Sequence, residues 1–296
     1  MSTLPLSSHP PLACLLAKQN GLPLIMAILN VTPDSFSDGG KLSNTTALLI
    51  AAEKAVNAGA NILDVGGEST RPGASQVPTE EEIERVTPAI EAIRHQFPTV
   101  PISIDTRKAA VASAAIAAGA TMVNDVSGLR YDSAMLGVIA THPVDLLLMH
   151  SAGTPQTMQQ NPHYPEGVVP HVCHFLQQAA TQVLQAGVSA ERIWIDPGFG
   201  FGKTIDHNLE LLAALPKLAQ LGFPLAVGLS RKSFLTLGQA ETIPPTHREP
   251  LTAAAHAIAI QAGVGLLRLH DVATQAPVLR WLQAYQQQAT GTQPKP

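Results

Sequence analysis

The stretch ISIDTRKAAVASAAIAAGATMVND, Ile102–Asp125, contains one complete unit of the pattern that decides the fold. A short apolar run, Ile102–Ile104, precedes a stretch with helical spacing, Lys108–Ala118, and a second apolar run follows at Met122–Val123. Short, continuously apolar runs are typical of strands buried on both faces of a parallel sheet. The stretch therefore predicts a strand, a helix and a second strand parallel to the first.

The same alternation continues in both directions along the chain. The other predicted strands are Leu24–Leu29, Ile62–Val65, Leu146–Met149, Ile193–Ile195, Leu225–Val227 and Leu266–Leu269. The other predicted helices include Thr45–Asn57, Glu80–Gln96, His171–Ala186, Asn208–Leu221 and Thr252–Gln261. Eight strands alternating with helices predict a closed (β/α)₈ TIM barrel.

Two further observations support a barrel over an open doubly wound sheet. No glycine fingerprint for phosphate follows the first strand, as the open fold would require. Ala-Gly pairs such as Ala58-Gly59 and Ala118-Gly119 recur before every second strand, where glycine suits the end of a helix. With no linker inside the barrel, we expect one domain over 21–290, a mobile or peripherally packed lead-in over 1–20 and a frayed tail over 291–296.

Composition excludes several classes of protein. The 296 residues carry a net charge of −4, which disfavours non-specific nucleic-acid binding. Only 14% of residues are charged, the opposite of a disordered chain, and this suggests that a second subunit covers part of the surface. No apolar stretch has the length of a membrane span, and the first residues do not resemble a signal peptide. Two cysteines without metal-ligand spacing point to a cytoplasmic protein.

Polar side chains stand at the carboxyl end of every predicted strand, where the active site of such a barrel lies. They are Asn30, Asp64, Asp105, Asn124-Asp125, His150, Asp196, the run Ser230-Arg231-Lys232-Ser233, and Arg268 with His270. Asp and Asn in these places could also cap the helices that follow. For His150 we expect a structural, hydrogen-bonded role.

The chemistry of this set divides in two. Asp64, Asp105, Asn124 and Asp196 offer the acceptors and the amide that suit a ring with several N–H donors. Cationic groups suited to a phosphate or pyrophosphate are Arg71, Lys232, Arg268 and His270, the last of which stands where the final helix begins. Asn30 could contact a Mg²⁺ ion held mostly by substrate phosphates and water.

Two loops rich in Gly, Pro, Ser and Asp follow the first two strands, at Thr32–Gly40 and Gly66–Ala74. Each carries a side chain of specific reach, Phe36 in the first and Arg71 in the second. We expect these loops to act as lids that close over a substrate and exclude water.

Seven motifs in order resemble those of the dihydropteroate synthase family. The first two are ILNVTPDSFSDGG at Ile28–Gly40 and DVGGESTRPG at Asp64–Gly73. The remaining five are Ser103–Thr106, Asn124–Gly128, Asp196–Lys203, Ser230–Ser233 and Arg268–Val272. The resemblance runs from about Leu22 to the last helix and departs from the usual family pattern at Ala27 and at Pro250-Leu251.

The resemblance implies an activity. The family joins p-aminobenzoate to (7,8-dihydropterin-6-yl)methyl diphosphate and releases pyrophosphate, giving dihydropteroate for folate biosynthesis. It implies that Asp105, Asn124, Asp196 and Lys232 hold the pterin, that Asn30, Arg71, Arg268 and His270 contact the pyrophosphate, with Asn30 on Mg²⁺, and that Phe36, Thr70, Pro72, Phe201 and Ser233 line the p-aminobenzoate pocket, which sulfonamides imitate. A homodimer paired through the last two helices is also implied.

The chemistry of this reaction needs no enzymatic nucleophile, because loss of pyrophosphate leaves a cation that the pterin ring delocalises. We expect Asp64 and Asp105 to face that cation and Lys232 and Arg71 to complete the catalytic set. Two alternatives remain open at this point. A methyltetrahydrofolate-binding methyltransferase would not need Ser230–Ser233 or Arg268–His270, and a non-catalytic pterin-binding paralogue would be expected to lose the loop residues first.

Overall fold

The computed structural model describes residues 9–19, 21–32, 41–70, 73–237 and 243–290. Eight parallel strands form one sheet in the order β6-β5-β4-β3-β2-β1-β8-β7. Their bounds are β1 Leu24–Asn30, β2 Ile62–Gly66, β3 Ile102–Asp105, β4 Met122–Asp125, β5 Asp145–Met149, β6 Ile193–Asp196, β7 Ala226–Val227 and β8 Leu266–Leu269. A parallel bridge between Ile195 and Leu225 joins β6 to the start of β7 and closes the ring. The predicted (β/α)₈ barrel is confirmed.

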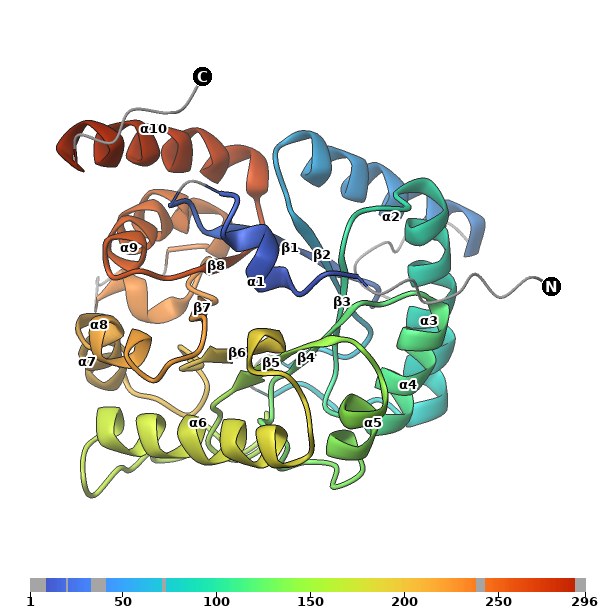
Figure 1. Ribbon diagram of the computed structural model, residues 1–296, viewed down its shortest axis with the longest axis horizontal. Coiled ribbons are helices and arrows are strands. Elements are labelled where there is room, and N and C mark those ends of the chain that lie inside the picture. Colours follow the sequence, from blue (N-terminus) through green and yellow to red (C-terminus); the bar gives the residue numbers. More distant parts are fainter. Residues whose placement is uncertain (1–8, 20, 33–40, 71–72, 238–242, 291–296) are drawn as a thin grey trace.

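Helices surround the barrel, as the view along its axis shows (Figure 1). They are α2 Lys41–Asn57, α3 Thr79–Gln96, α4 Ala109–Ala118, α5 Met135–Thr141, α6 Val168–Gln185, α7 Ile205–Ala213, α8 Leu215–Ala219, α9 Glu249–Gln261 and α10 Val272–Thr290. The continuous helix predicted over Asn208–Leu221 is wrong, because it breaks into α7 and α8 at Ala214. Pro216 lies at the start of α8, where its missing N–H costs no intrahelical hydrogen bond. The sequence analysis also missed the short helix α5.

Part of the lead-in packs against the amino-terminal end of the barrel. Helix α1, Leu12–Leu16, crosses that end of the ring in Figure 1. Leu12 is buried among inward-facing apolar residues that include Met26 and Trp194. Burial of one such leucine contributes about 2 kcal/mol. Its amide also donates to Asp145 Oδ1 at 3.1 Å, which ties α1 to β5.

Two layers of core result. The larger lies between the outward faces of the strands and the helices. The smaller fills the amino-terminal half of the barrel with residues such as Ile62, Met122 and Leu266. Within the described residues, no helix has the length and apolarity of a membrane span.

Candidate active site

The upper half of the barrel interior is polar because of strand periodicity. Residues two apart on a strand point to the same face. In four strands an inward apolar residue of the lower layer is followed two positions later by a predicted site residue. These pairs are Ile62 and Asp64, Met122 and Asn124, Trp194 and Asp196, and Leu266 and Arg268. Asp105, at the end of β3, is paired in register with Asn124 on β4. The barrel therefore brings the predicted pterin residues together at one mouth.

Arg268 bridges two of the carboxylates. Its Nε donates to Asp64 Oδ2 at 2.7 Å, and its Nη2 donates to Asp105 Oδ2 at 2.6 Å. Both carboxylates are almost wholly buried, with Asp64 0% and Asp105 5% exposed. Burial lowers the pKa of Arg268, but the two carboxylates outweigh that effect and hold it above its ordinary value. The guanidinium therefore stays charged, and its charge offsets the repulsion between the two neighbouring buried acids.

The same carboxylates keep acceptor atoms for a ligand. Within the described residues, Asp64 Oδ1 and Asp105 Oδ1 are buried with no hydrogen-bond partner. Burial raises the pKa of Asp105 to about 7, which the Arg268 charge opposes and the Asp64 charge reinforces. Buried polar atoms normally have partners, so the two oxygens mark a place where donors are missing.

Asp196 lies across the mouth at the end of β6. Its Oδ1 accepts the amide of Gly198 at 2.7 Å. Burial raises the pKa of Asp196 to about 6, against the lowering effects of that hydrogen bond and of the nearby cations, Lys232 first among them. Lys232 places Nζ 4.2 Å from the centre of the Phe201 ring, a cation–π contact.

The cap alternative is wrong for two of the acids. Helix α4 has Lys108 at its N-cap and no side-chain cap, so Asp105 does not cap it. Thr204, not Asp196, caps α7. These aspartates therefore have no role in starting the helices that follow them.

Asn30 and His270 complete the rim on the β1 and β8 side. An ideal Cβ on Gly66 would lie 3.5 Å from Asn30 Oδ1 and 3.6 Å from Asp105 Cβ, so Asn30 lies close to Asp105. His270 contacts Ser230, which follows β7, and the distance from His270 Nδ1 to Ser230 Oγ is 3.0 Å. Ser233 is exposed at the start of a 3₁₀ turn, Ser233–Thr236. Phe36, Arg71 and Pro72 lie outside the described residues.

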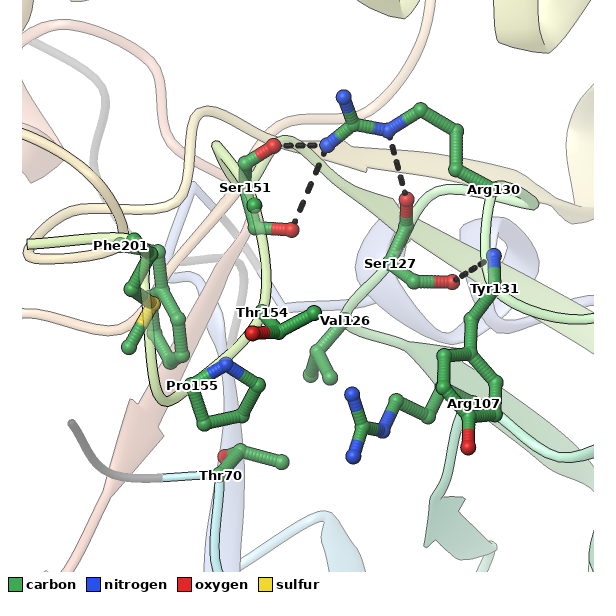
Figure 2. Close-up of a pocket in the computed structure, with 12 residues that line it drawn as sticks. Thr70, Arg107, Val126, Ser127, Arg130, Tyr131, Ser151, Thr154, Pro155 and Phe201 are labelled. Carbon is green, nitrogen blue, oxygen red and sulfur yellow. Dashed lines mark hydrogen bonds between the residues drawn. The ribbon is translucent and has the colours of Figure 1, made fainter. Parts of the chain in front are cut away.

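A pocket of about 250 Å³ opens beside this mouth (Figure 2). Thr70 and Phe201, two residues predicted for p-aminobenzoate, lie on its wall. The rest of the lining, which includes Arg107, Arg130 and Tyr131, was not predicted. Arg107 follows the strand-end residue Asp105, and Arg130 follows the strand-end motif that contains Ser127-Gly128. Their closeness in sequence to these motifs is the signal that would have predicted them.

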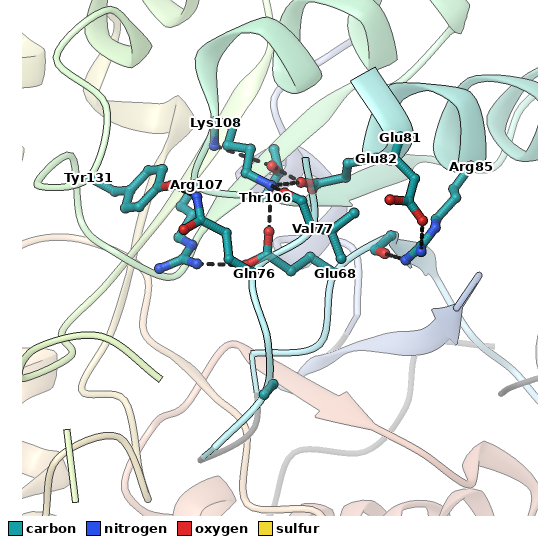
Figure 3. Close-up of polar contacts among 12 residues, drawn as sticks. Glu68, Gln76, Val77, Glu81, Glu82, Arg85, Thr106, Arg107, Lys108 and Tyr131 are labelled. Carbon is teal, nitrogen blue, oxygen red and sulfur yellow. Dashed lines mark hydrogen bonds and ion pairs between the residues drawn. The ribbon is translucent and has the colours of Figure 1, made fainter. Parts of the chain in front are cut away.

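A buried ion network supports the second loop (Figure 3). Glu68 accepts from Arg107 Nη2 at 2.6 Å and also from the ammonium of Lys108. Lys108 donates to Glu82 Oε2 at 2.6 Å as well. Burial raises the pKa of Glu68, but the hydrogen bonds from Lys108 and Arg107 prevail and hold it below its ordinary value. The network fixes the start of the loop that leads to Thr70.

The fold and this mouth define a class of protein. Barrels of this type carry their active sites at the carboxyl ends of the strands, and here that end presents paired acids, an amide and two cations. The chain matches the family described as pterin binding enzyme over residues 26–270.

Comparison with known proteins shows which family of pterin-binding enzymes this chain resembles. Dihydropteroate synthase of Synechocystis sp. is 44% identical over 258 residues, 86% of this chain and 88% of that one. The structure of Xanthomonas albilineans dihydropteroate synthase with 4-aminobenzoic acid has a TM-score of 0.83 at 44% identity, covering 90% of this chain and 94% of that one. The same enzyme in complex with 7,8-dihydropteroate has a TM-score of 0.80 at 41% identity, covering 90% and 95%. The chain belongs to the dihydropteroate synthase family of pterin-binding enzymes.

Proposed function

We propose that this protein joins p-aminobenzoate to (7,8-dihydropterin-6-yl)methyl diphosphate, giving 7,8-dihydropteroate and pyrophosphate. The observation that carries the proposal is the polar upper layer of the barrel, in which Arg268 bridges two buried acids that each keep an unpartnered oxygen. A ring rich in N–H groups supplies the missing donors. Relatives that carry the synthase name favour this reaction over that of a methyltransferase.

The pterin binds, in this proposal, between Asp105, Asn124 and Asp196. Acceptor oxygens of the two acids meet ring N–H groups, and the Asn124 amide meets a mixed donor and acceptor edge. Lys232 lies beside Asp196, and its Nζ can donate to a ring carbonyl. Asp64 and Asp105 face the ring, where positive charge develops as the C–O bond breaks.

Pyrophosphate leaves toward Asn30, Arg71, Arg268 and His270. Only Nε and Nη2 of Arg268 engage the two acids, so its Nη1 is directed to neither carboxylate. The amine nitrogen of p-aminobenzoate then forms the new C–N bond and gives its extra proton to water. The aryl ring lies against Phe36, Thr70, Pro72, Phe201 and Ser233, and the two loops over Thr32–Gly40 and Gly66–Ala74 exclude water.

A magnesium ion fits this chemistry with Asn30 as its protein contact. Within the described part of the chain no three His, Cys, Asp or Glu side chains form a metal-binding cluster. One amide oxygen is enough, because Mg²⁺ keeps several waters and takes substrate phosphate oxygens as ligands. When bound, it neutralises charge on the leaving pyrophosphate.

The direct test measures pyrophosphate and dihydropteroate with both substrates and Mg²⁺. We expect sustained release only when p-aminobenzoate is present, and loss of at least about 10²-fold in rate with excess EDTA, restored by added Mg²⁺. Pterin binding without release would favour a non-catalytic paralogue. Full rate in EDTA would contradict the metal proposal alone.

The raised pKa of Asp196 gives a pH prediction. Because burial raises it to about 6, acidification below that value protonates the carboxylate that must accept ring N–H groups. Asp105, the other proposed acceptor, has a pKa of about 7, so we expect the Kd for 6-hydroxymethyl-7,8-dihydropterin, measured by calorimetry, to begin to rise below pH 7. Below pH 6, protonation of Asp196 should add a further rise of about tenfold per pH unit. Asp196→Asn should bind weakly at all pH values and lose this added acid limb below pH 6. An unchanged limb in the variant would assign it to another group.

We also propose a homodimer and a cytoplasmic location. Exposed apolar side chains gather on the last two long helices, with Ile258 on α9 and Trp281 and Tyr285 on α10. Trp281 is 66% exposed and stacks on Tyr285, a costly surface for a lone chain. Sedimentation velocity should give twice the chain mass, and a monomer at micromolar concentration would overturn the pairing. The free thiols of Cys14 and Cys173 suit a reducing compartment.

A further inference from the structure

The ammonium of Lys203 is buried in a cage of acceptors behind the proposed site. It lies 2.9 Å from the carbonyl oxygen of Gly198, 3.0 Å from that of Phe201 and 3.0 Å from His150 Nδ1. Lys203 is only 4% exposed. None of these acceptors is a carboxylate, so the cage resembles the carbonyl shell around a bound cation, with a lysine side chain in its place.

The charges around the cage agree with this geometry. Burial, with the charges of Lys203 and Arg130, lowers the pKa of His150 far below its ordinary value, so the imidazole is neutral. Its Nδ1 lone pair can therefore accept from Lys203. Burial lowers the pKa of Lys203 to about 7, while the charge of Asp196 opposes that fall.

The segment held by Lys203 is Asp196–Lys203, which has the sequence DPGFGFGK. Gly198 has φ 69°, and an ideal Cβ there would lie 1.8 Å from the His150 carbonyl oxygen, so the segment presses directly on the end of β5. No other residue fits at that position. Lys203 binds both sides of this contact and closes the segment into a tight loop.

The other side of the loop faces the β7 end. Phe199 stacks on Phe234 with ring centres 5.9 Å apart. Phe201 lies beneath Lys232 Nζ at 4.2 Å. The Asp196 carboxylate begins the same loop and accepts the Gly198 amide. The loop thus contains two groups assigned above to the substrates, Asp196 and Phe201, and contacts a third, Lys232.

We propose that Lys203 is a positioning residue, which fixes the Gly198–Phe201 loop on His150 and thereby sets Phe201 and Lys232 for pterin and p-aminobenzoate. This inference rests on the proposed function, because Lys232 is taken as a pterin ligand. Lys203 itself touches no substrate. Its effect on Lys232 passes through Phe201, so its loss should weaken pterin binding more where Lys232 is present than where it is absent.

A double-mutant cycle tests the coupling. The four proteins are the native chain, Lys203→Met, Lys232→Ala and the double variant, and the readout is the Kd for 6-hydroxymethyl-7,8-dihydropterin by calorimetry. We expect Lys203→Met to raise Kd about tenfold in the native background, as loss of charge-assisted hydrogen bonds implies. In the Lys232→Ala background it should raise Kd by less, because interacting residues are non-additive. The effect that remains there acts through Asp196, which begins the same loop.

Two controls separate positioning from general loss of structure. Lys217→Met, at an exposed lysine of α8, should leave Kd unchanged. Amide hydrogen exchange in Lys203→Met should speed up at Gly200 and Phe201 while the β2 and β3 amides stay protected. If Lys203→Met does not fold, Lys203→Gln, which keeps N–H donors but not the charge, takes its place in the cycle.

The outcomes are distinct. Equal effects of Lys203→Met in both backgrounds, or unchanged exchange in the loop, would overturn the positioning role. A Kd that Lys232→Ala leaves unchanged would instead overturn the proposed pterin site. An effect of Lys203→Met that is clearly larger in the native background than in the Lys232→Ala background supports both.

Discussion

Arg268→Met should lower the free energy of unfolding by about 3–5 kcal/mol at pH 8, since removal of one partner strands buried charge. Arg268 is the hydrogen-bonded cation between Asp64 and Asp105, which are both buried. Methionine fills much of the same volume but leaves two acids facing each other without a counter-charge. Urea unfolding at fixed pH measures the loss.

The pH dependence of this loss has a definite sign. Burial raises the pKa of Asp105 to about 7 against the lowering effect of the Arg268 charge, so without the guanidinium that pKa should rise further above its unfolded value of about 4. The stabilising effect of a raised acid pKa is present at low pH and lost as pH rises through the folded pKa. The penalty of Arg268→Met should therefore be smaller at pH 5 than at pH 8.

A matched double variant isolates the cause. Asp105→Asn in the Arg268→Met background removes one of the stranded charges, so it should recover part of the lost stability at pH 8. Arg280→Met, at an exposed arginine of α10, should change stability by less than about 0.5 kcal/mol. A penalty for Arg268→Met that is the same at pH 5 and pH 8 would show that lost packing, not stranded charge, is responsible.

Sequence pattern predicted the barrel because strand and helix periodicity are local properties. It also placed Asp64, Asp105, Asn124 and Asp196 at strand ends, and in a parallel barrel all strand ends meet at one mouth. The prediction needed only the order of elements. Short elements such as α1 and α5, and the break between α7 and α8, were missed because five to seven residues carry little periodic signal.

Pairing inside the mouth was not predictable in the same way. Arg268 meets Asp64 across 204 residues of sequence, and Arg107 meets Glu68 across 39. Such partners depend on barrel closure and on the loop paths, which no local pattern encodes. No role was predicted from the sequence for Glu68 or Lys203, although Glu68 is buried among cations and Lys203 among hydrogen-bond acceptors. A charged residue near a strand end of this mouth therefore either binds a ligand or pairs with another group of the protein, and the sequence does not distinguish these two roles.

Among the charged residues at the mouth, Lys232 is the one whose loss should affect catalysis most, because its side-chain amine lies beside Asp196 and above Phe201. We expect Lys232→Ala to lower kcat/KM for the dihydropterin diphosphate by about 10²–10³-fold, the cost of removing one preorganised charge from a dry site. The stopped assay for dihydropteroate measures it, and Lys217→Ala serves as the exposed control. Unchanged turnover would remove Lys232 from the site.

The same substitution has a second readout that a simple loss of fold would not produce. Lys232 lowers the pKa of Asp196, so its removal should raise that pKa and move the acid limb of pterin binding to higher pH. Lys232→Arg keeps the charge and should leave the limb near pH 6, even though a planar guanidinium does not reproduce the ammonium contact with a ring carbonyl. If Lys232→Ala lowers turnover but leaves the acid limb of pterin binding at the same pH, Lys232 contacts the substrate without influencing the pKa of Asp196. If the limb moves as expected, one cation both binds the ring and keeps its neighbouring acid ionised, and recognition of the pterin depends on the pair rather than on either residue alone.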